Sequence, residues 1–94
     1  MRITITPAAA GDLDEIWAYL NDRSPRAAEK TIDRITDGIT LLAAFPLWFP
    51  LHGLSVRKLL VSPYLVFYTV TVNRVVVLRV LHGARDLSAF DLAW

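Results

Sequence analysis

The chain has 94 residues, which is enough for one hydrophobic core and one domain spanning residues 1–94. Apolar residues make up 54% of it and charged residues 20%, a composition that excludes an intrinsically disordered protein. The net charge of +1 by itself indicates no class of partner, and the absence of cysteine excludes disulfides and thiolate metal sites.

The first element in chain order is a short strand that leads into a helix. Ile3 and Ile5 alternate with polar residues, which predicts a strand that ends at Pro7. Thr6 is placed to cap a helix that starts at this proline and runs to about Asn21. The apolar residues of the helix step by three and four, which predicts one buried face: Ala9, Leu13, Ile16, Trp17 and Leu20.

A second helix is predicted to begin at Pro25, with Ser24 as its cap. Its apolar side chains recur at alternating spacings of four and three: Ala28, Ile32, Ile35, Ile39 and Leu42. Only Asp22 and Arg23 join the two helices, so these must fold back as a hairpin. Their apolar stripes together can cover one face of a sheet.

Three strands are predicted after an irregular apolar connection over residues 45–53, and they span residues 55–61, 64–72 and 75–81. The short gaps between them suit tight turns, so the strands form an antiparallel meander. The fold class is therefore α+β: a short N-terminal strand, an α-helical hairpin and a three-stranded antiparallel meander. A two-residue turn at Asn73-Arg74 would place Tyr68 opposite Arg79, which predicts a cation–π or hydrogen-bonded pair.

Both faces of the β-hairpin predicted over residues 64–72 and 75–81 are largely apolar. One face carries Tyr64, Val66, Tyr68, Val70, Val77, Arg79 and Leu81, and the other carries Leu65, Phe67, Thr69, Val76, Leu78, Val80 and His82. An antiparallel sheet with one solvated face alternates polar and apolar residues, so two apolar faces imply cover on both sides. Two helices cover only one face. We therefore expect residues 87–94 or a second chain to cover part of the other.

Charge is divided unevenly along the chain. The part before His52 has five basic and seven acidic residues, and the part after it has five basic and two acidic ones. The sheet half is therefore cationic, which is compatible with a face that meets an anionic partner. The two histidines, His52 and His82, are thirty residues apart without other ligands nearby, so we expect no metal and no cofactor. No segment has the length of a membrane span or the pattern of a signal peptide, which predicts a cytoplasmic protein without membrane contact.

Particular residues accompany this order of elements. They are Asp12-Leu13, Ile16-Trp17 and Tyr19 on the first helix, Phe45-Pro46 after the second, Val56-Arg57-Lys58-Leu59 and Tyr64-Leu65-Val66-Phe67-Tyr68 in the meander, and Val80-Leu81-His82-Gly83-Ala84-Arg85-Asp86 at its end. Over nearly its whole length the chain thereby resembles the RelE/ParE superfamily of toxins from bacterial type II toxin–antitoxin modules, more closely the ParE-like branch.

The resemblance implies one of two activities, because ParE-type members poison DNA gyrase and block replication, while RelE-type members cut messenger RNA on the ribosome. Metal-free RNA cleavage needs a base, an acid and cations for the phosphorane. By position Lys58 and Arg85 match basic residues of the ribonuclease site, and His82 is a further candidate. Where that branch carries an arginine, a lysine and a tyrosine, this chain has Leu65, Val56 and Phe90-Asp91. We therefore interpret the protein as a non-catalytic gyrase inhibitor, with a ribosome-dependent mRNA endoribonuclease as the alternative.

The same resemblance implies two contact surfaces. The target-binding residues are Arg57, Lys58, Arg85, Asp86, Phe90 and Trp94. The residues that bind a cognate antitoxin, a small protein with an amphipathic C-terminal segment, are Ile16, Tyr19, Leu20, Leu47, Trp48 and Phe49. The two proteins would form a hetero-oligomeric complex, and a third hypothesis keeps only this antitoxin-binding function. A second interpretation of His82 is a strand-end histidine that is hydrogen-bonded to the backbone.

Overall fold

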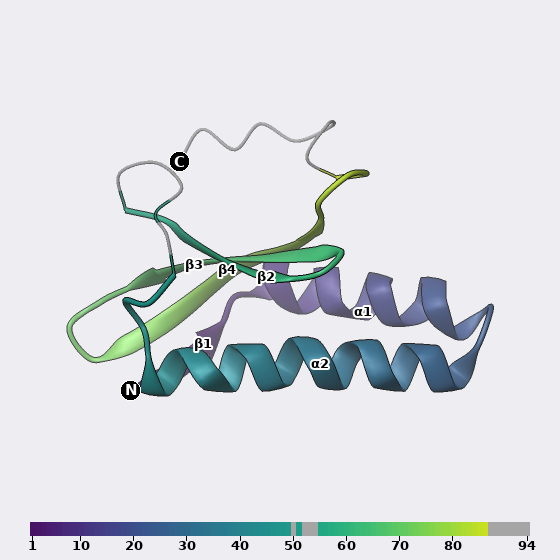
Figure 1. The fold of residues 1–94 in the computed structure, drawn as a ribbon, viewed down its shortest axis with the longest axis horizontal. Helices are drawn as coiled ribbons and strands as arrows, with labels where there is room; N and C mark the ends of the chain where they lie inside the picture. Colours follow the sequence, from purple (N-terminus) through teal and green to yellow (C-terminus); the bar gives the residue numbers. More distant parts are fainter. Residues whose placement is uncertain (50, 52–54, 87–94) are drawn as a thin grey trace.

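A computed structural model of the protein describes residues 1–49, 51 and 55–86 (Figure 1). The elements in chain order are β1 (Arg2–Ile5), α1 (Pro7–Asn21), α2 (Pro25–Ala44), β2 (Arg57–Val61), β3 (Tyr64–Val70) and β4 (Arg74–His82). The α+β class and the order of elements expected from the sequence are confirmed. The expected strands over residues 55–61 and 64–72 are each two residues too long, and β4 extends one residue beyond the expected strand at both ends.

The four strands form one sheet in the order β1-β4-β3-β2. The pairs β2–β3 and β3–β4 are antiparallel, which confirms the meander, while β1 pairs with β4 in parallel. Both helices lie on the same face of this sheet (Figure 1). Within the described part of the chain, no helix is long and apolar enough to cross a membrane.

The two helices begin where their capping residues predict. The Thr6 hydroxyl accepts a hydrogen bond from the backbone N–H of Ala9, and the Ser24 hydroxyl accepts one from Ala27, both at 3.2 Å. Each cap is followed by a proline in the first turn, where a missing N–H costs nothing. The two caps thus fix where each helix of the hairpin begins.

The main core lies between the helices and the sheet. Its fully or nearly fully buried members are Ala9, Ile16, Ile35, Ile39, Leu42, Leu59, Tyr64, Val66, Tyr68, Val75, Val77 and Val80. Helix α2 approaches β2 closely at Gly38, where an added Cβ would lie 3.0 Å from Leu59 Cδ2 and 3.1 Å from Val61 Cγ2. A larger residue at this position would therefore separate the helix from the strand.

The register of the β3–β4 hairpin differs from the expected one. Val70, not Val72, pairs with Val75, because the turn spans residues 71–74. A β-bulge then interrupts the ladder, so that Tyr68 lies opposite Val77 while the next pair joins Phe67 to Arg79. One extra residue reverses the facing of everything beyond it. As a result Val80 packs in the helix-side core and Leu81 on the opposite face, the reverse of the expected assignment.

A second, smaller apolar cluster occupies the sheet face that points away from the helices. Val56, Phe67 and Leu81 are buried there, and Leu65 and Leu78 pack against them. Two apolar faces were expected from the sequence, and this cluster confirms them. Residues 87–94, one expected cover for this face, lie outside the described residues.

Candidate functional site

A groove runs between α1 and the end of β4, and we call it the α1–β4 groove. It has a volume of about 260 Å³ and is lined by Asp12, Glu15, Ile16, Tyr19, Val80, Arg85 and Asp86. Carboxylates outnumber cations on its walls. This charge is unfavourable for a phosphate group and distinguishes the groove from a nucleic-acid channel.

The groove exists because β1 pairs with β4 only as far as Val77. Beyond that point the outer edge of β4 is completed by side chains. The Thr6 hydroxyl donates to the carbonyl oxygen of Leu78 at 3.0 Å, and the backbone N–H of Val80 donates to Asp12 Oδ2 at 2.9 Å. The N–H of His82 donates to Asp86 Oδ2 at 2.6 Å. Side-chain acceptors thus occupy backbone donors that would otherwise be open to another strand.

Asp12 and Arg79 form the ion pair on the floor of the groove. The Arg79 Nε and Nη2 atoms lie 2.7 and 2.8 Å from the two Asp12 carboxylate oxygens, which is a bidentate arrangement. Hydrogen bonding to the Asp12 carboxylate, more than any other influence, raises the pKa of Arg79 above its usual value. The expected pairing of Arg79 with Tyr68 is wrong, since the turn over residues 71–74 places Tyr68 opposite Val77 and the bulge beyond this pair places Arg79 opposite Phe67.

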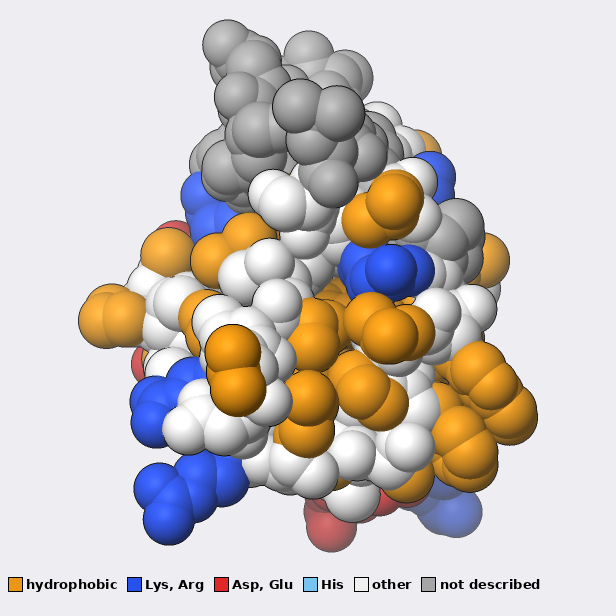
Figure 2. All heavy atoms as spheres, turned by 90° about the vertical axis from the view of Figure 1, so that its left-hand side faces the viewer, with side chains coloured by type: hydrophobic (Ala, Val, Ile, Leu, Met, Phe, Trp, Pro, Cys, Tyr) orange, Lys and Arg blue, Asp and Glu red, His pale blue; other side chains and the backbone are white. Residues whose placement is uncertain are grey.

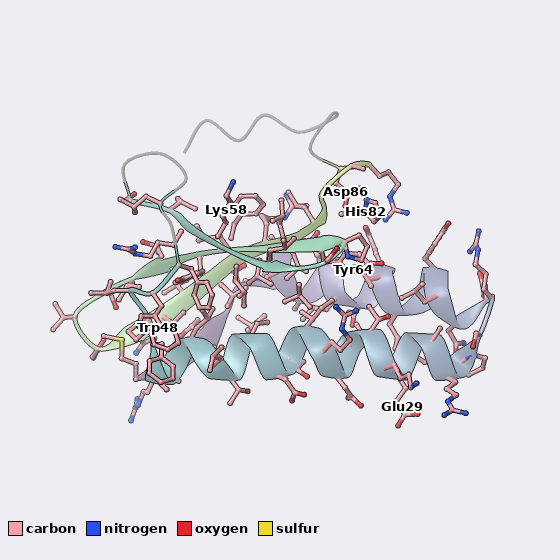
Figure 3. The ribbon with its side chains drawn as sticks, viewed as in Figure 1. Glu29, Trp48, Lys58, Tyr64, His82 and Asp86 are labelled. Carbon is pink, nitrogen blue, oxygen red and sulfur yellow. The ribbon has the colours of Figure 1, made fainter. Side chains whose placement is uncertain are left out.

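The turn that follows β4 is closed by its own side chains. His82 Nδ1 accepts a hydrogen bond from the backbone N–H of Arg85 at 3.1 Å, and the Asp86 N–H donates to the His82 carbonyl oxygen at 2.8 Å. This confirms the interpretation of His82 as a strand-end histidine bonded to the backbone. Tyr64 meets the His82 ring edge-on, at 5.5 Å between ring centres (Figure 3). Burial raises the pKa of Tyr64, and the nearby Arg85 charge partly offsets that rise.

Arg85 lies at the mouth of the groove beside an aromatic ring. Its Nε atom is 3.3 Å from Asp86 Oδ1, and its guanidinium carbon is 5.1 Å from the ring centre of Tyr19. The Arg23 guanidinium lies over the same ring at 3.9 Å. Residues far apart in the chain thus assemble one small polar cluster, and no pattern along the chain indicates that Tyr19 belongs to it.

Lys58 does not lie beside Arg85, although both were expected on one target-binding surface. Lys58 pairs with Phe67 and so belongs to the sheet face opposite the helices, whereas Arg85 meets α1. Strand spacing and rise place the Cα atoms of Lys58 and His82 roughly 14 Å apart. Figure 3 shows Lys58 over the middle of the sheet, while His82 and Asp86 lie together toward the end of β4.

Exposed hydrophobic side chains gather at the other end of the molecule, where α2 ends and the N-terminus lies (Figure 1). We call this set the apolar end, and it consists of Met1, Leu41, Phe45, Leu47, Trp48 and Leu51. Trp48 is 70% exposed and Leu47 63%. Trp48 stacks on Phe45 with 4.0 Å between ring centres. Figure 2 faces this end and shows hydrophobic side chains across it, with Lys and Arg side chains mainly toward its margin.

The loop that carries the apolar end is tied down through its backbone. The Tyr68 hydroxyl donates to the carbonyl oxygen of Pro46 at 3.0 Å, and Arg57 Nη1 donates to those of Phe49 at 2.8 Å and Leu47 at 3.4 Å. Backbone anchoring leaves the side chains of Leu47 and Trp48 free to contact a partner. Arg57, expected to bind the target, is instead engaged with this loop because it faces Tyr68 across the β2–β3 pair.

The expected antitoxin-binding residues separate into three groups. Leu47 and Trp48 belong to the apolar end, and Tyr19 lines the α1–β4 groove. Ile16 is buried in the main core at 5% exposure and also lines the α1–β4 groove. Leu20 and Phe49 pack partly buried against the same core.

Of the expected target-binding residues, Arg85 and Asp86 lie together at the groove, while Phe90 and Trp94 lie outside the described residues. Within the part of the chain that the structure describes, no three His, Asp or Glu side chains are arranged to hold a metal ion.

Comparisons with known proteins point to one family. The family model described as ParE toxin of type II toxin-antitoxin system, parDE, matches residues 3–87. A similar solved structure is described as the chromosomal ParDE TA system from P. aeruginosa. It shares 26% sequence identity with this chain at a TM-score of 0.75, and the match covers 87% of this chain and 95% of that one. No curated protein matches the chain significantly.

Proposed function

The chain belongs to the ParE toxin family of type II toxin–antitoxin systems, and from that premise we propose that it inhibits DNA gyrase and blocks replication until a cognate antitoxin captures it. The proposal has two parts, the capture by the antitoxin and the action on the target. Both place the protein in the cytoplasm.

The observation that supports capture is the apolar end. Monomeric proteins rarely expose adjoining aromatic and aliphatic side chains without a binding function. Trp48 and Leu47 are exposed on a loop whose backbone is already anchored by Tyr68 and Arg57. A partner therefore gains the burial of these side chains without first having to order the loop. An amphipathic C-terminal segment of the antitoxin fits this surface, and binding yields a hetero-oligomeric complex.

The separation of Lys58 from Arg85 favours inhibition by binding over RNA cleavage. A ribonuclease must bring a base, an acid and several cations to one phosphate. The described residues place Lys58 on one face of the sheet and Arg85 at the groove, and His82 Nδ1 already accepts the Arg85 N–H. A gyrase inhibitor needs only a contact surface, and the Arg85 cluster offers one.

The decisive assay is supercoiling of relaxed plasmid DNA by purified gyrase in the presence of the purified toxin. We expect loss of supercoiled product and accumulation of cleaved DNA, with weaker inhibition by Arg85→Ala. The matched control is Arg26→Ala, which removes an exposed arginine on α2 outside both surfaces. Full gyrase activity at a large excess of toxin would contradict the proposal. Metal-independent cuts in ribosome-bound transcripts, abolished by Arg85→Ala, would instead support the RelE-type alternative.

A further inference from the structure

We infer that Tyr19 is a positioning residue for Arg85, and that it therefore serves the target-binding surface rather than the antitoxin-binding one. The inference rests on the proposed function for its activity readout. Its structural content, that the ring of Tyr19 holds the guanidinium of Arg85 at the mouth of the α1–β4 groove, stands on the geometry alone.

Arg85 is restrained through both its backbone and its side chain. Its backbone N–H is held by His82 Nδ1, its Nε atom lies 3.3 Å from Asp86, and its guanidinium lies 5.1 Å from the Tyr19 ring centre. An exposed ion pair between neighbouring residues contributes little by itself. The ring lies within the roughly 6 Å over which a guanidinium is attracted to an aromatic face. The Tyr19 ring is thus a contact that joins the Arg85 side chain to α1.

Tyr19 is itself well placed to act as a support. It sits on α1 one turn beyond Glu15 and Ile16, both of which line the same groove. Arg23 covers the ring at 3.9 Å and its Nη1 atom donates to the Tyr19 carbonyl oxygen at 3.0 Å. The ring is therefore held by its own helix and by a second cation, and it presents a stable surface to Arg85.

The test is a double-mutant cycle in gyrase binding, with the toxin titrated against purified gyrase. Tyr19→Leu removes the aromatic ring and should weaken binding about two- to five-fold, the range of an exposed cation–π contact. Tyr19→Phe keeps the ring and should bind like the unmodified toxin. In an Arg85→Ala background Tyr19→Leu should have no further effect, because the residue it positions is gone.

The matched control is Trp17→Leu, which removes a different half-exposed aromatic ring from α1. It should leave gyrase binding unchanged. Additive effects of Tyr19→Leu and Arg85→Ala would overturn the inference, since they would show that the ring contacts the target directly.

A second readout does not depend on the target. The NMR signal of the Arg85 Nε–H group should shift in Tyr19→Leu, through loss of the aromatic ring, and stay close to its original position in Tyr19→Phe and Trp17→Leu. An Arg85 signal that is insensitive to Tyr19→Leu would overturn the positioning role even if the toxin inhibits gyrase. If the toxin does not bind gyrase at all, the proposed function fails while this signal still tests the positioning of Arg85.

Discussion

The two ends of this molecule use polar groups in opposite ways. At the apolar end, Tyr68 and Arg57 donate hydrogen bonds to backbone carbonyls, and the side chains of Leu47 and Trp48 remain exposed. At the α1–β4 groove, the polar side chains bind one another, so that Asp12 is paired with Arg79 and Asp86 with Arg85. One end is prepared for a partner's apolar surface, and the other is already largely satisfied within the chain.

The two ends therefore contribute differently to binding. Burial of exposed apolar area gives affinity, at about 25 cal/mol per Å². A polar cluster that is satisfied in the free protein gives little net energy when a partner replaces its contacts, but it discriminates strongly by geometry. We therefore expect the apolar end to supply affinity and the groove to supply stability and target specificity.

The largest expected effect concerns Asp12, on the floor of the groove. Asp12→Ala leaves the Arg79 guanidinium without its bidentate partner and the Val80 N–H without its acceptor. Removal of one partner from a buried ion pair typically costs about 3–5 kcal/mol, and because the Arg79 side chain is 22% exposed, the lower end of this range, about 3 kcal/mol, applies here. We expect the free energy of unfolding, measured by urea denaturation, to fall by this amount.

Asp14→Ala is the matched control, since Asp14 is an exposed carboxylate on the same helix. Its substitution should change the free energy of unfolding by less than about 0.5 kcal/mol. If the Asp12 and Asp14 variants were equally stable, the polar contacts of the groove would not be a main source of the stability of the fold.

The next effect concerns Trp48, at the apolar end. Trp48→Ala removes the most exposed aromatic side chain of this surface and should weaken antitoxin binding by about 2 kcal/mol or more, roughly thirty-fold, as expected for an aromatic anchor. The measurement is calorimetric titration with the antitoxin. Because Trp48 is 70% exposed, thermal stability of the free toxin should change little.

Trp17→Ala is the matched control, because Trp17 is also a solvent-exposed tryptophan, at 46%, but lies on α1. Its substitution should affect antitoxin binding less than that of Trp48. An equal loss in both variants would mean that the antitoxin does not bind mainly at the apolar end.

The local elements could be predicted from the sequence, because their signals are local. Thr6 and Ser24 are each followed by a proline, and each does cap a helix. The meander followed from two short gaps between apolar runs. The β3–β4 register could not be predicted, since a bulge depends on the competition between many cross-strand contacts. The extra residue of the bulge exchanged the faces expected for Val80 and Leu81. Arg79 pairs with Asp12 and not with the expected partner.

The candidate site was less predictable, because it depends on which residues meet in space. Leu47 and Trp48 were found from the sequence, since large apolar residues in a loop with two prolines are unusual. The contacts of Arg57 with the loop could not be predicted, because its binding partners are backbone carbonyls, which have no sequence signature. Tyr19 and Arg85 meet only because α1 packs beside the end of β4, and no spacing along the chain indicates that contact.

The smallest expected effect tests the anchor of the apolar end. Tyr68→Phe removes the hydroxyl that donates to the Pro46 carbonyl, and it should lower the free energy of unfolding by about 1 kcal/mol near neutral pH. Arg57→Ala, which removes the other anchor, serves as a comparison at the same loop. If Tyr68→Phe lowered antitoxin affinity without lowering stability, the hydroxyl would be a partner contact and not an anchor.

The same variant has a pH dependence of known sign. Burial raises the pKa of Tyr68 above the ordinary value of 10.0, with Arg57 and the Phe49 backbone opposing the rise. The folded protein therefore favours the neutral phenol, so this tyrosine's contribution is intact below pH 10 and is lost as pH rises through the folded-state pKa. Urea denaturation from about pH 8 to about pH 11 should show a shallower alkaline loss of stability in Tyr68→Phe than in the unmodified protein. Some loss remains in that variant because burial also raises the pKa of Tyr64. Identical slopes in the two proteins would mean that Tyr68 has the same pKa in the folded and the unfolded chain, which would contradict a rise caused by burial.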